Sequence, residues 1–146
     1  MEWKIIPFIG MGPVKFGMSP SEVSEILGSP KNVTTRGETL REQRAIDMPM
    51  IRYINDKVTE IEAFYTVKNV TLDDVNIFEN EGLEVLVDLE LKNEGAKVDV
   101  GIIMFENLGL TAGRLDEDVT GEHSVTAFCG GHWDDYMEDF TDISFQ

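Results

Sequence analysis

The clearest pattern of apolar and polar positions follows Ser19, where a short amphipathic helix is expected. Ser19 and Glu22 have the spacing of a capping box, in which each side chain bonds the other residue's backbone N–H. Gly28 lies where a helix of about nine residues would end. The apolar stripe between these residues has the i, i+3, i+4 spacing of one helix face and comprises Val23, Ile26 and Leu27.

Alternating apolar and polar residues then predict antiparallel strands. The range 50–65 has the pattern of a β-hairpin, with Asn55 and Asp56 as its tight turn. The range 40–46 is expected to pair beside it, with one solvated face because it carries several charges. A brief extended segment is also expected at 14–16, before the helix.

Residues 81–94 fit two patterns. Apolar residues alternate with polar ones, as in a strand, but a helical stripe with Gly95 as its stop also fits. An internal repeat at a fixed offset favours the helix. The repeat units span 14–66 and 75–114. The matched positions are Phe16, Glu22, Val23 and Leu27 in the first unit and Phe78, Glu84, Val85 and Leu89 in the second.

The rest of the chain is expected to form strands at 98–105, 108–114 and 124–129, with an acidic turn at 116–122 and a terminal helix at about 131–140. One face of that helix would carry Trp133, Tyr136, Met137 and Phe140, and another would carry Asp135, Glu138, Asp139 and Asp142.

These elements predict a single α+β domain over residues 1–146. Two helix-plus-antiparallel-strands repeats would form one curved sheet, with the helices packed on one face. The length is near that of an ordinary domain, and 42% hydrophobic residues suffice for a core.

Charge is divided unequally between the two halves of the chain. Residues 1–68 carry nine basic and nine acidic side chains, whereas residues 69–146 carry three basic and nineteen acidic ones. The formal net charge of −16 therefore belongs to the second half. Such a field favours a basic partner and repels nucleic acid and anionic membranes, so neither is expected as a partner.

The compartment is expected to be the cytoplasm. The single Cys129 cannot form an internal disulfide, which fits a reducing environment. The first residues lack the basic leader and long apolar run of a signal peptide. No stretch approaches the roughly 20 apolar residues that a membrane helix needs.

Candidate catalytic or metal-binding groups are few. Zinc sites usually need three or four nitrogen or sulfur ligands, and this chain offers only His123, Cys129 and His132. For a nucleophile built from Cys129 and His132, nothing indicates a third, orienting residue. The range 116–122 begins like a calcium loop, but Ala127 stands where a bidentate Glu is required. We expect no metal, no cofactor and no enzymatic activity.

Part of the chain resembles a known fold family. The run Phe16-Gly17-Met18-Ser19, with Glu22-Val23, Leu27-Gly28 and Pro30, is similar to the helical module of beta-lactamase-inhibitor-protein-like folds. The second repeat unit lacks the Gly-Met and Pro of that motif. The stretch from Ile6-Pro7 to Met18 also resembles small immunity proteins encoded beside bacterial polymorphic toxins. The resemblance implies a duplicated α+β inhibitor or immunity fold.

Together, charge and resemblance predict an immunity protein that occludes a basic toxin, plausibly a nuclease, with an acidic surface. The alternatives are a binding or scaffold module for another basic protein and, for the acidic residues, a merely solvated face. The oligomeric state stays open. The expected partner-binding residues are Asp135, Glu138, Asp139 and Asp142 of the terminal helix, Asp116, Glu117, Asp118 and Glu122 of the acidic turn, and the aromatic residues Trp133 and Tyr136.

Overall fold

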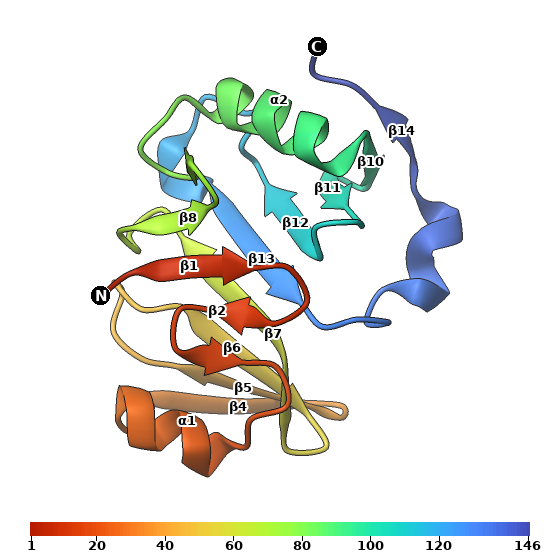
Figure 1. Cartoon of the computed structure of the whole chain (residues 1–146). Coiled ribbons are helices and arrows are strands. Elements are labelled where there is room, and N and C mark those ends of the chain that lie inside the picture. Colours follow the sequence, from red (N-terminus) through yellow and green to blue (C-terminus); the bar gives the residue numbers. More distant parts are fainter.

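The computed structural model describes all residues from 1 to 146 and contains two sheets and two α-helices (Figure 1). The strands of the large sheet are β4 (Asn32–Arg36), β5 (Thr39–Gln43), β6 (Met50–Ile54), β7 (Lys57–Phe64), β10 (Ala96–Asp99), β11 (Ile102–Phe105), β12 (Leu110–Gly113), β13 (Ser124–Phe128) and β14 (Thr141–Ile143). The small sheet comprises β1 (Trp3–Ile6), β2 (Gly10–Met11), β3 (Val14–Lys15), β8 (Val70–Leu72) and β9 (Val75–Asn76).

The large sheet has the order β14-β10-β11-β12-β13-β7-β6-β5-β4, and every neighbouring pair in it is antiparallel. The small sheet has the order β3-β2-β1-β8-β9 and includes one parallel pair, β1 with β8. The α+β class is therefore confirmed. The expectation of one sheet is wrong, because short segments near the N-terminus and after residue 69 form a second one.

Helix α1 (Pro20–Leu27) begins and ends where its sequence predicts. The Ser19 hydroxyl accepts from the Glu22 N–H, and the Glu22 carboxylate accepts from the Ser19 N–H. Gly28 follows the helix with a positive φ, and its N–H donates to the Ser24 carbonyl. Of the predicted apolar stripe, Val23 is fully buried and Leu27 packs against the core, whereas Ile26 is exposed.

Residues 81–94 form a helix, α2 (Gly82–Asn93), and not a strand. Val85, Leu86 and Leu89 are fully buried on one side of it. No side chain caps its first turn. Its start lies unusually close to the loop after β12, because a Cβ on Gly82 would stand 2.0 Å from the Leu115 carbonyl oxygen.

One hydrophobic core lies between two layers. Its 27 buried residues come from the inner face of the large sheet, from the small sheet and from both helices. The small sheet lies across the middle of the large one, with α1 and α2 on either side of it (Figure 1). Both helices therefore belong to the layer that covers one face of the large sheet. The opposite face is open except where the chain after β13 packs on it.

The strands follow each helix in the same order. Strands β4 to β7 follow α1, and β10 to β13 follow α2. The last strand of each set, β7 and β13, pair with one another at the middle of the sheet. The predicted hairpin at 50–65 is confirmed as β6 and β7, with Asn55 and Asp56 both at positive φ in the turn.

The predicted strand at 98–105 is wrong, because two strands occupy this region. Val100 and Gly101 form a tight turn between β10 and β11, and both have positive φ. Turns of this kind favour Asn-Gly or Asp-Gly. A β-branched Val in that conformation is uncommon, so the sequence pattern does not indicate the turn.

The predicted α-helix at 131–140 is also wrong. The chain forms a short 3₁₀ segment, η2 (Asp134–Asp139), and then β14, which pairs with β10. A 3₁₀ helix rises about 2.0 Å per residue, more than the 1.5 Å of an α-helix, so six residues carry the chain farther toward the sheet edge. Asp142 lies on β14 and not on the helix, so the predicted face of four carboxylates is not formed.

Candidate functional site: an acidic pocket at the start of α2

The acidic residues predicted to bind a partner fall into two groups. Asp116, Glu117, Asp118 and Glu122 lie between β12 and β13, including the 3₁₀ turn η1 (Thr120–Glu122). Asp135, Glu138 and Asp139 lie in η2, beyond the other end of β13. Strand β13 lies between the two groups along the chain, and the cavity lined by the first group includes no residue of the second. The fold does not bring the two groups together.

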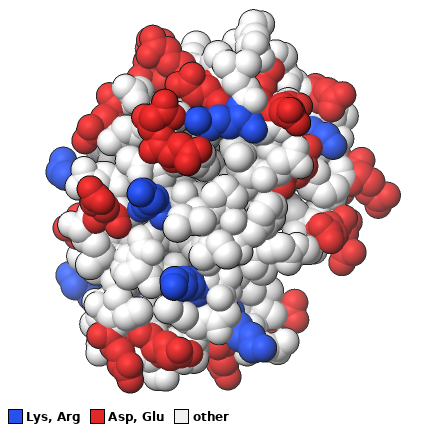
Figure 2. All heavy atoms as spheres, in the orientation of Figure 1, with Lys and Arg blue, Asp and Glu red and all other residues white.

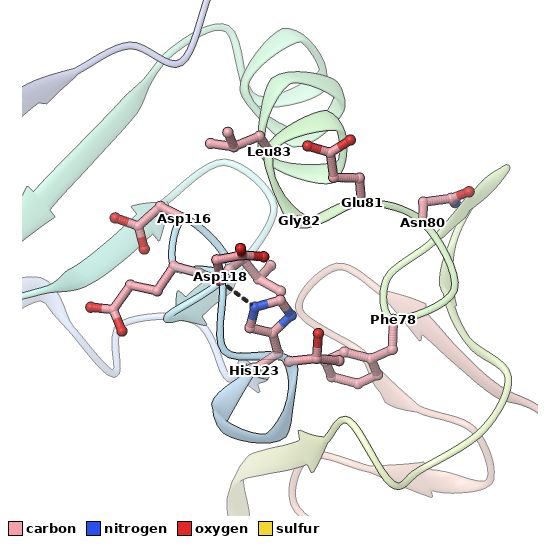
Figure 3. Close-up of a pocket in the computed structure, with 11 residues that line it drawn as sticks. Phe78, Asn80, Glu81, Gly82, Leu83, Asp116, Asp118 and His123 are labelled. Atoms are coloured by element: carbon pink, nitrogen blue, oxygen red, sulfur yellow. Dashed lines mark hydrogen bonds between the residues drawn. The ribbon is translucent and has the colours of Figure 1, made fainter.

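The first group lines a pocket with the start of α2. The cavity has a volume of about 340 Å³, and four carboxylate side chains border it: Glu81, Asp116, Glu117 and Asp118. Figure 3 shows Glu81 beside the first turn of α2, with Asp116 and Asp118 on the facing loop. At Gly82 these two segments approach so closely that no side chain would fit between them.

His123 forms the floor of this pocket. Its side chain is buried, and its Nε2 donates a hydrogen bond of 2.8 Å to the Glu117 carbonyl oxygen (Figure 3). This bond fixes the loop that carries Asp116 to Asp118 against the start of β13. The acidic side chains are therefore presented by a braced loop.

Arg114 is the one cation that contacts the acidic loop. Its Nη1 lies 2.7 Å from Glu122 and 3.3 Å from Glu117. Glu81, Asp116 and Asp118 form no ion pair. The N-terminus of α2 contributes about half a positive charge, which offsets only part of theirs. The pocket is therefore strongly negative and open to a cation.

The second group surrounds an aromatic cluster on the open face of the sheet. Met104, Phe128 and Phe140 are buried together, and Trp133 and Met137 pack against them. Tyr136 is 57% exposed and stacks edge-on against Trp133. Trp133 and Phe140 therefore anchor the chain after β13 to the sheet, and Tyr136 is the exposed one of the two aromatic residues predicted to bind a partner.

Carboxylates lie on several sides of the molecule. In Figure 2 they gather over α2 and along the right-hand border, where the C-terminal segment lies, and a smaller group lies near α1. The middle of this face is mostly uncharged, with a few Lys and Arg side chains and fewer carboxylates. Negative charge is thus widespread, and what distinguishes the pocket is its concave lining of carboxylates.

The cysteine and the histidines do not form a common centre. His123 and Cys129 lie just before and just after β13, and His132 Nε2 lies 3.3 Å from a carboxylate oxygen of Glu60. Burial raises the pKa of the Cys129 thiol, which disfavours the nucleophilic thiolate. No group of three or more His, Cys, Asp or Glu side chains is arranged to hold a metal ion.

Glu81 was missed by the sequence predictions. It is separated from the acidic loop by more than thirty residues, and only the packing of α2 against that loop brings it there. The one local signal is an acidic residue directly before a helix, a common position that does not by itself indicate a site.

Comparisons with known proteins assign no family. No family model matches the chain, and no curated protein does. A crystal structure of a cysteine-rich secretory protein from Staphylococcus aureus matches with a TM-score of 0.45 and 12% identity, over 89% of this chain and 49% of that one. The chain spans about half the length of that protein, and a match at this level carries no functional argument.

Neither helix is long and apolar enough to cross a membrane.

Proposed function

We propose that this chain is a cytoplasmic, non-enzymatic immunity protein that blocks a basic protein toxin. The observation that carries the proposal is the pocket in which Glu81, Asp116, Glu117 and Asp118 surround one cavity. Its mechanism is stoichiometric occlusion: a cationic surface that the toxin uses for its own anionic substrate is covered instead by these carboxylates.

The pocket suits a lysine or arginine side chain from the partner. Carboxylates accept the charge-assisted hydrogen bonds that ammonium and guanidinium groups donate, and these bonds are about twice as strong as neutral ones. The apolar lining from Phe78, Leu83 and Leu115 can contact the methylene stem of the same side chain. A partner with a protruding basic residue would therefore fill the cavity.

The uneven charge of the chain supports fast capture. All of the net charge of −16 belongs to residues 69–146, which form the pocket. Electrostatic steering of this kind raises association rates to about 10⁸–10⁹ M⁻¹ s⁻¹ at low salt. Speed matters for an inhibitor that must act before its toxin does.

The proposal includes a duplicated fold, with α1 and β4–β7 as one copy and α2 and β10–β13 as the other. Support comes from the mirrored strand order around β7 and β13 and from the burial of Val23 and Val85 at matching helix positions. The second copy would then extend to residue 128, beyond the boundary at 114 that the sequence predicts.

The proposal is tested with the protein encoded beside this chain in its native genome. Coexpression should restore growth that this neighbour alone arrests, and the purified pair should form a complex whose affinity falls steeply with salt. Charge reversal of Glu81, Asp116 and Asp118 to Lys should weaken the complex by at least about a hundredfold, from a few kcal/mol of lost charge pairing.

A matched control changes the net charge by the same amount at the other end of β13. Reversal of Asp135, Glu138 and Asp139 to Lys should reduce the association rate only, and by less than about tenfold. Equal effects of the two triple variants would show that only overall charge matters and would contradict the pocket. No effect of either would contradict the acidic interface as a whole.

The second candidate function is a binding module that docks on a basic protein without inhibiting it. The same pocket favours it. A complex that forms, responds to the pocket variants and leaves the partner's activity unchanged would support this alternative over immunity.

A further inference from the structure

Strand β4 is a free edge of the large sheet. It pairs with β5 on one side only, and all five of its residues, Asn32 to Arg36, are exposed. It contains no proline and no bulge, two devices that natural edge strands use against pairing with other chains. The edge is therefore available for strand addition.

The hairpin register identifies the groups that this edge offers. Arg36 and Thr39 flank a two-residue turn and therefore form a hydrogen-bonded pair, and the pairs alternate from there along the ladder. The N–H and C=O groups of Arg36, Thr34 and Asn32 then point toward β5. Those of Val33 and Thr35 point outward.

Two arginines lie beside this edge without carboxylate partners. Arg36 and Arg41 point to the open face of the sheet and line a polar cavity of about 520 Å³ with threonine side chains. Neither forms an ion pair, although Arg41 Nε donates to the Thr34 hydroxyl at 3.3 Å. Arg52, in the same cavity, is already paired with Glu60 and Glu62.

We propose that the β4 edge binds an extended acidic segment of a partner protein. Backbone groups of Val33 and Thr35 would pair with the segment, which supplies affinity, and alternate acidic side chains of the segment would reach Arg36 and Arg41, which supplies specificity. This interface is separate from the acidic pocket and does not depend on it.

A second copy of the chain fits this edge less well. Antiparallel pairing of two β4 strands about Thr34 would place Arg36 and Arg41 of both copies around one contact. The one carboxylate that lines their cavity, Glu60, is already paired with Arg52. Like charges across a strand pair are destabilising. An acidic segment neutralises these arginines instead.

The test uses a fluorescent peptide of about ten residues in which valine and glutamate alternate, long enough to form one strand. Its affinity for the full chain is compared with that of a valine–lysine peptide of the same length. The glutamate peptide should bind at least about tenfold more tightly, because only it can pair with the arginines. Equal affinities would overturn the proposal.

Two sets of variants separate the edge from the charge. Thr35→Pro removes an outward N–H without altering the hydrogen bonds between β4 and β5, and should lower the affinity for the glutamate peptide at least about tenfold. Thr35→Val keeps the N–H and should bind this peptide as the wild type does. Arg36→Gln with Arg41→Gln should abolish the preference for glutamate over lysine. Thermal melts of each variant establish that it is folded.

Unchanged binding by Thr35→Pro would overturn strand addition. The oligomeric state of the chain is also measured in the absence of any peptide. A dimer that Thr35→Pro converts to a monomer would assign the edge to a second copy and overturn the acidic partner.

Discussion

The two helix-plus-strand sets that meet at β7 and β13 share a layout but differ in how their helices are fastened and in what they present to solvent. In the first set, a buried ion pair connects α1 to the sheet. In the second, α2 is held by the C-terminal residues and by the acidic loop. The comparison teaches that apolar positions determine the common layout, while charged positions are free to differ between the sets.

The fastening of α1 depends on Arg44. Its Nε donates to the Gly28 carbonyl at 2.8 Å and its Nη2 to the Ser24 hydroxyl at 3.2 Å, both at the end of α1. The same guanidinium lies 3.3 Å from Glu42, which accepts a bond of 2.5 Å from the Tyr53 hydroxyl. Burial and this carboxylate raise the pKa of Tyr53 well above its usual value, so the phenol stays neutral.

The fastening of α2 depends on Glu90. Its carboxylate accepts hydrogen bonds from the Ser144 hydroxyl at 2.8 Å, the Phe145 N–H at 2.7 Å and the Gln146 side-chain amide at 2.8 Å. These bonds hold the residues after β14 against the helix. Sequence patterns indicate neither fastening, because each joins residues far apart in the chain.

The largest loss of stability is expected when the buried ion pair of the first set is removed. Arg44→Ala leaves the Glu42 carboxylate buried without its cation and should lower the free energy of unfolding by about 3–5 kcal/mol. Urea denaturation measures this. Arg41→Ala, three residues earlier on β5 and exposed, should change stability by less than about 0.5 kcal/mol. Similar values for the two variants would contradict the role of Arg44.

The hydrogen bonds of Glu90 in the second set should contribute less to the free energy of unfolding. Glu90→Gln weakens three charge-assisted bonds and should lower the free energy of unfolding by about 1.5–3 kcal/mol at neutral pH. Glu84→Gln, exposed on the same helix, is the control. Hydrogen exchange should show faster opening of residues 144–146 in the Glu90 variant and not in the control.

The hydrogen bonds of Glu90 also predict that stability depends on pH. The Phe145 N–H, more than the other donors, holds the pKa of Glu90 below its usual value. A carboxyl with a lowered folded-state pKa stabilises the fold above its ordinary pKa, and this contribution is lost as pH falls through the folded-state value. The stability difference between wild type and Glu90→Gln should therefore shrink in acid. A constant difference would contradict this role of the Glu90 hydrogen bonds.

The next largest effect on stability is expected at the contact between α2 and the acidic loop. Gly82→Ala forces the helix away from the Leu115 carbonyl and should lower the free energy of unfolding by about 1–3 kcal/mol. Gly121→Ala is the control, since a Cβ there meets its nearest atom at 3.9 Å. In the α1 set, a Cβ on Gly28 or Gly37 would meet no atom within 4 Å, so a neutral Gly82 variant would remove this distinction between the sets.

The smallest effect concerns the first hairpin turn of each set. The β4–β5 turn has Gly37 at φ 59°, whereas the β10–β11 turn has Val100 at φ 48°. Val100→Asn should raise the free energy of unfolding by about 1 kcal/mol, because Asn tolerates this conformation. Val119→Asn, exposed at a negative φ, should bring no gain. Equal effects in thermal denaturation would mean that Val100 is not strained.

Predictions that rest on a cap or a turn between adjacent residues were correct, whereas two that rest on apolar spacing, the strand at 98–105 and the helix at 131–140, were wrong. The capping box of Ser19 and Glu22 and the turn at Asn55 and Asp56 each depend on contacts within a few positions. The helix at 81–94 was favoured over a strand only by the internal repeat. The terminal helix failed although its apolar spacing was regular. Phe140 and Trp133 are fixed by Phe128 and Met104, and pairing of β14 with β10 draws the chain out of an α-helix.

The candidate site was predicted only in part. The sequence indicates the acidic loop at 116–122, and the unequal charge of the two halves marks the region. It does not indicate Glu81 or the free β4 edge. Which carboxylates share a cavity depends on how α2 packs against the loop, and which strand is left unpaired depends on the order of the whole sheet.

The sequence by itself determined the class of the fold, the bounds of α1 and the sign and location of its charge along the chain, because caps, short turns and composition act over short distances along the chain. Only the tertiary structure decided which charged groups meet, which stay buried in pairs, and which edges remain open. Those outcomes depend on contacts between residues that are distant in sequence, and no local pattern encodes them.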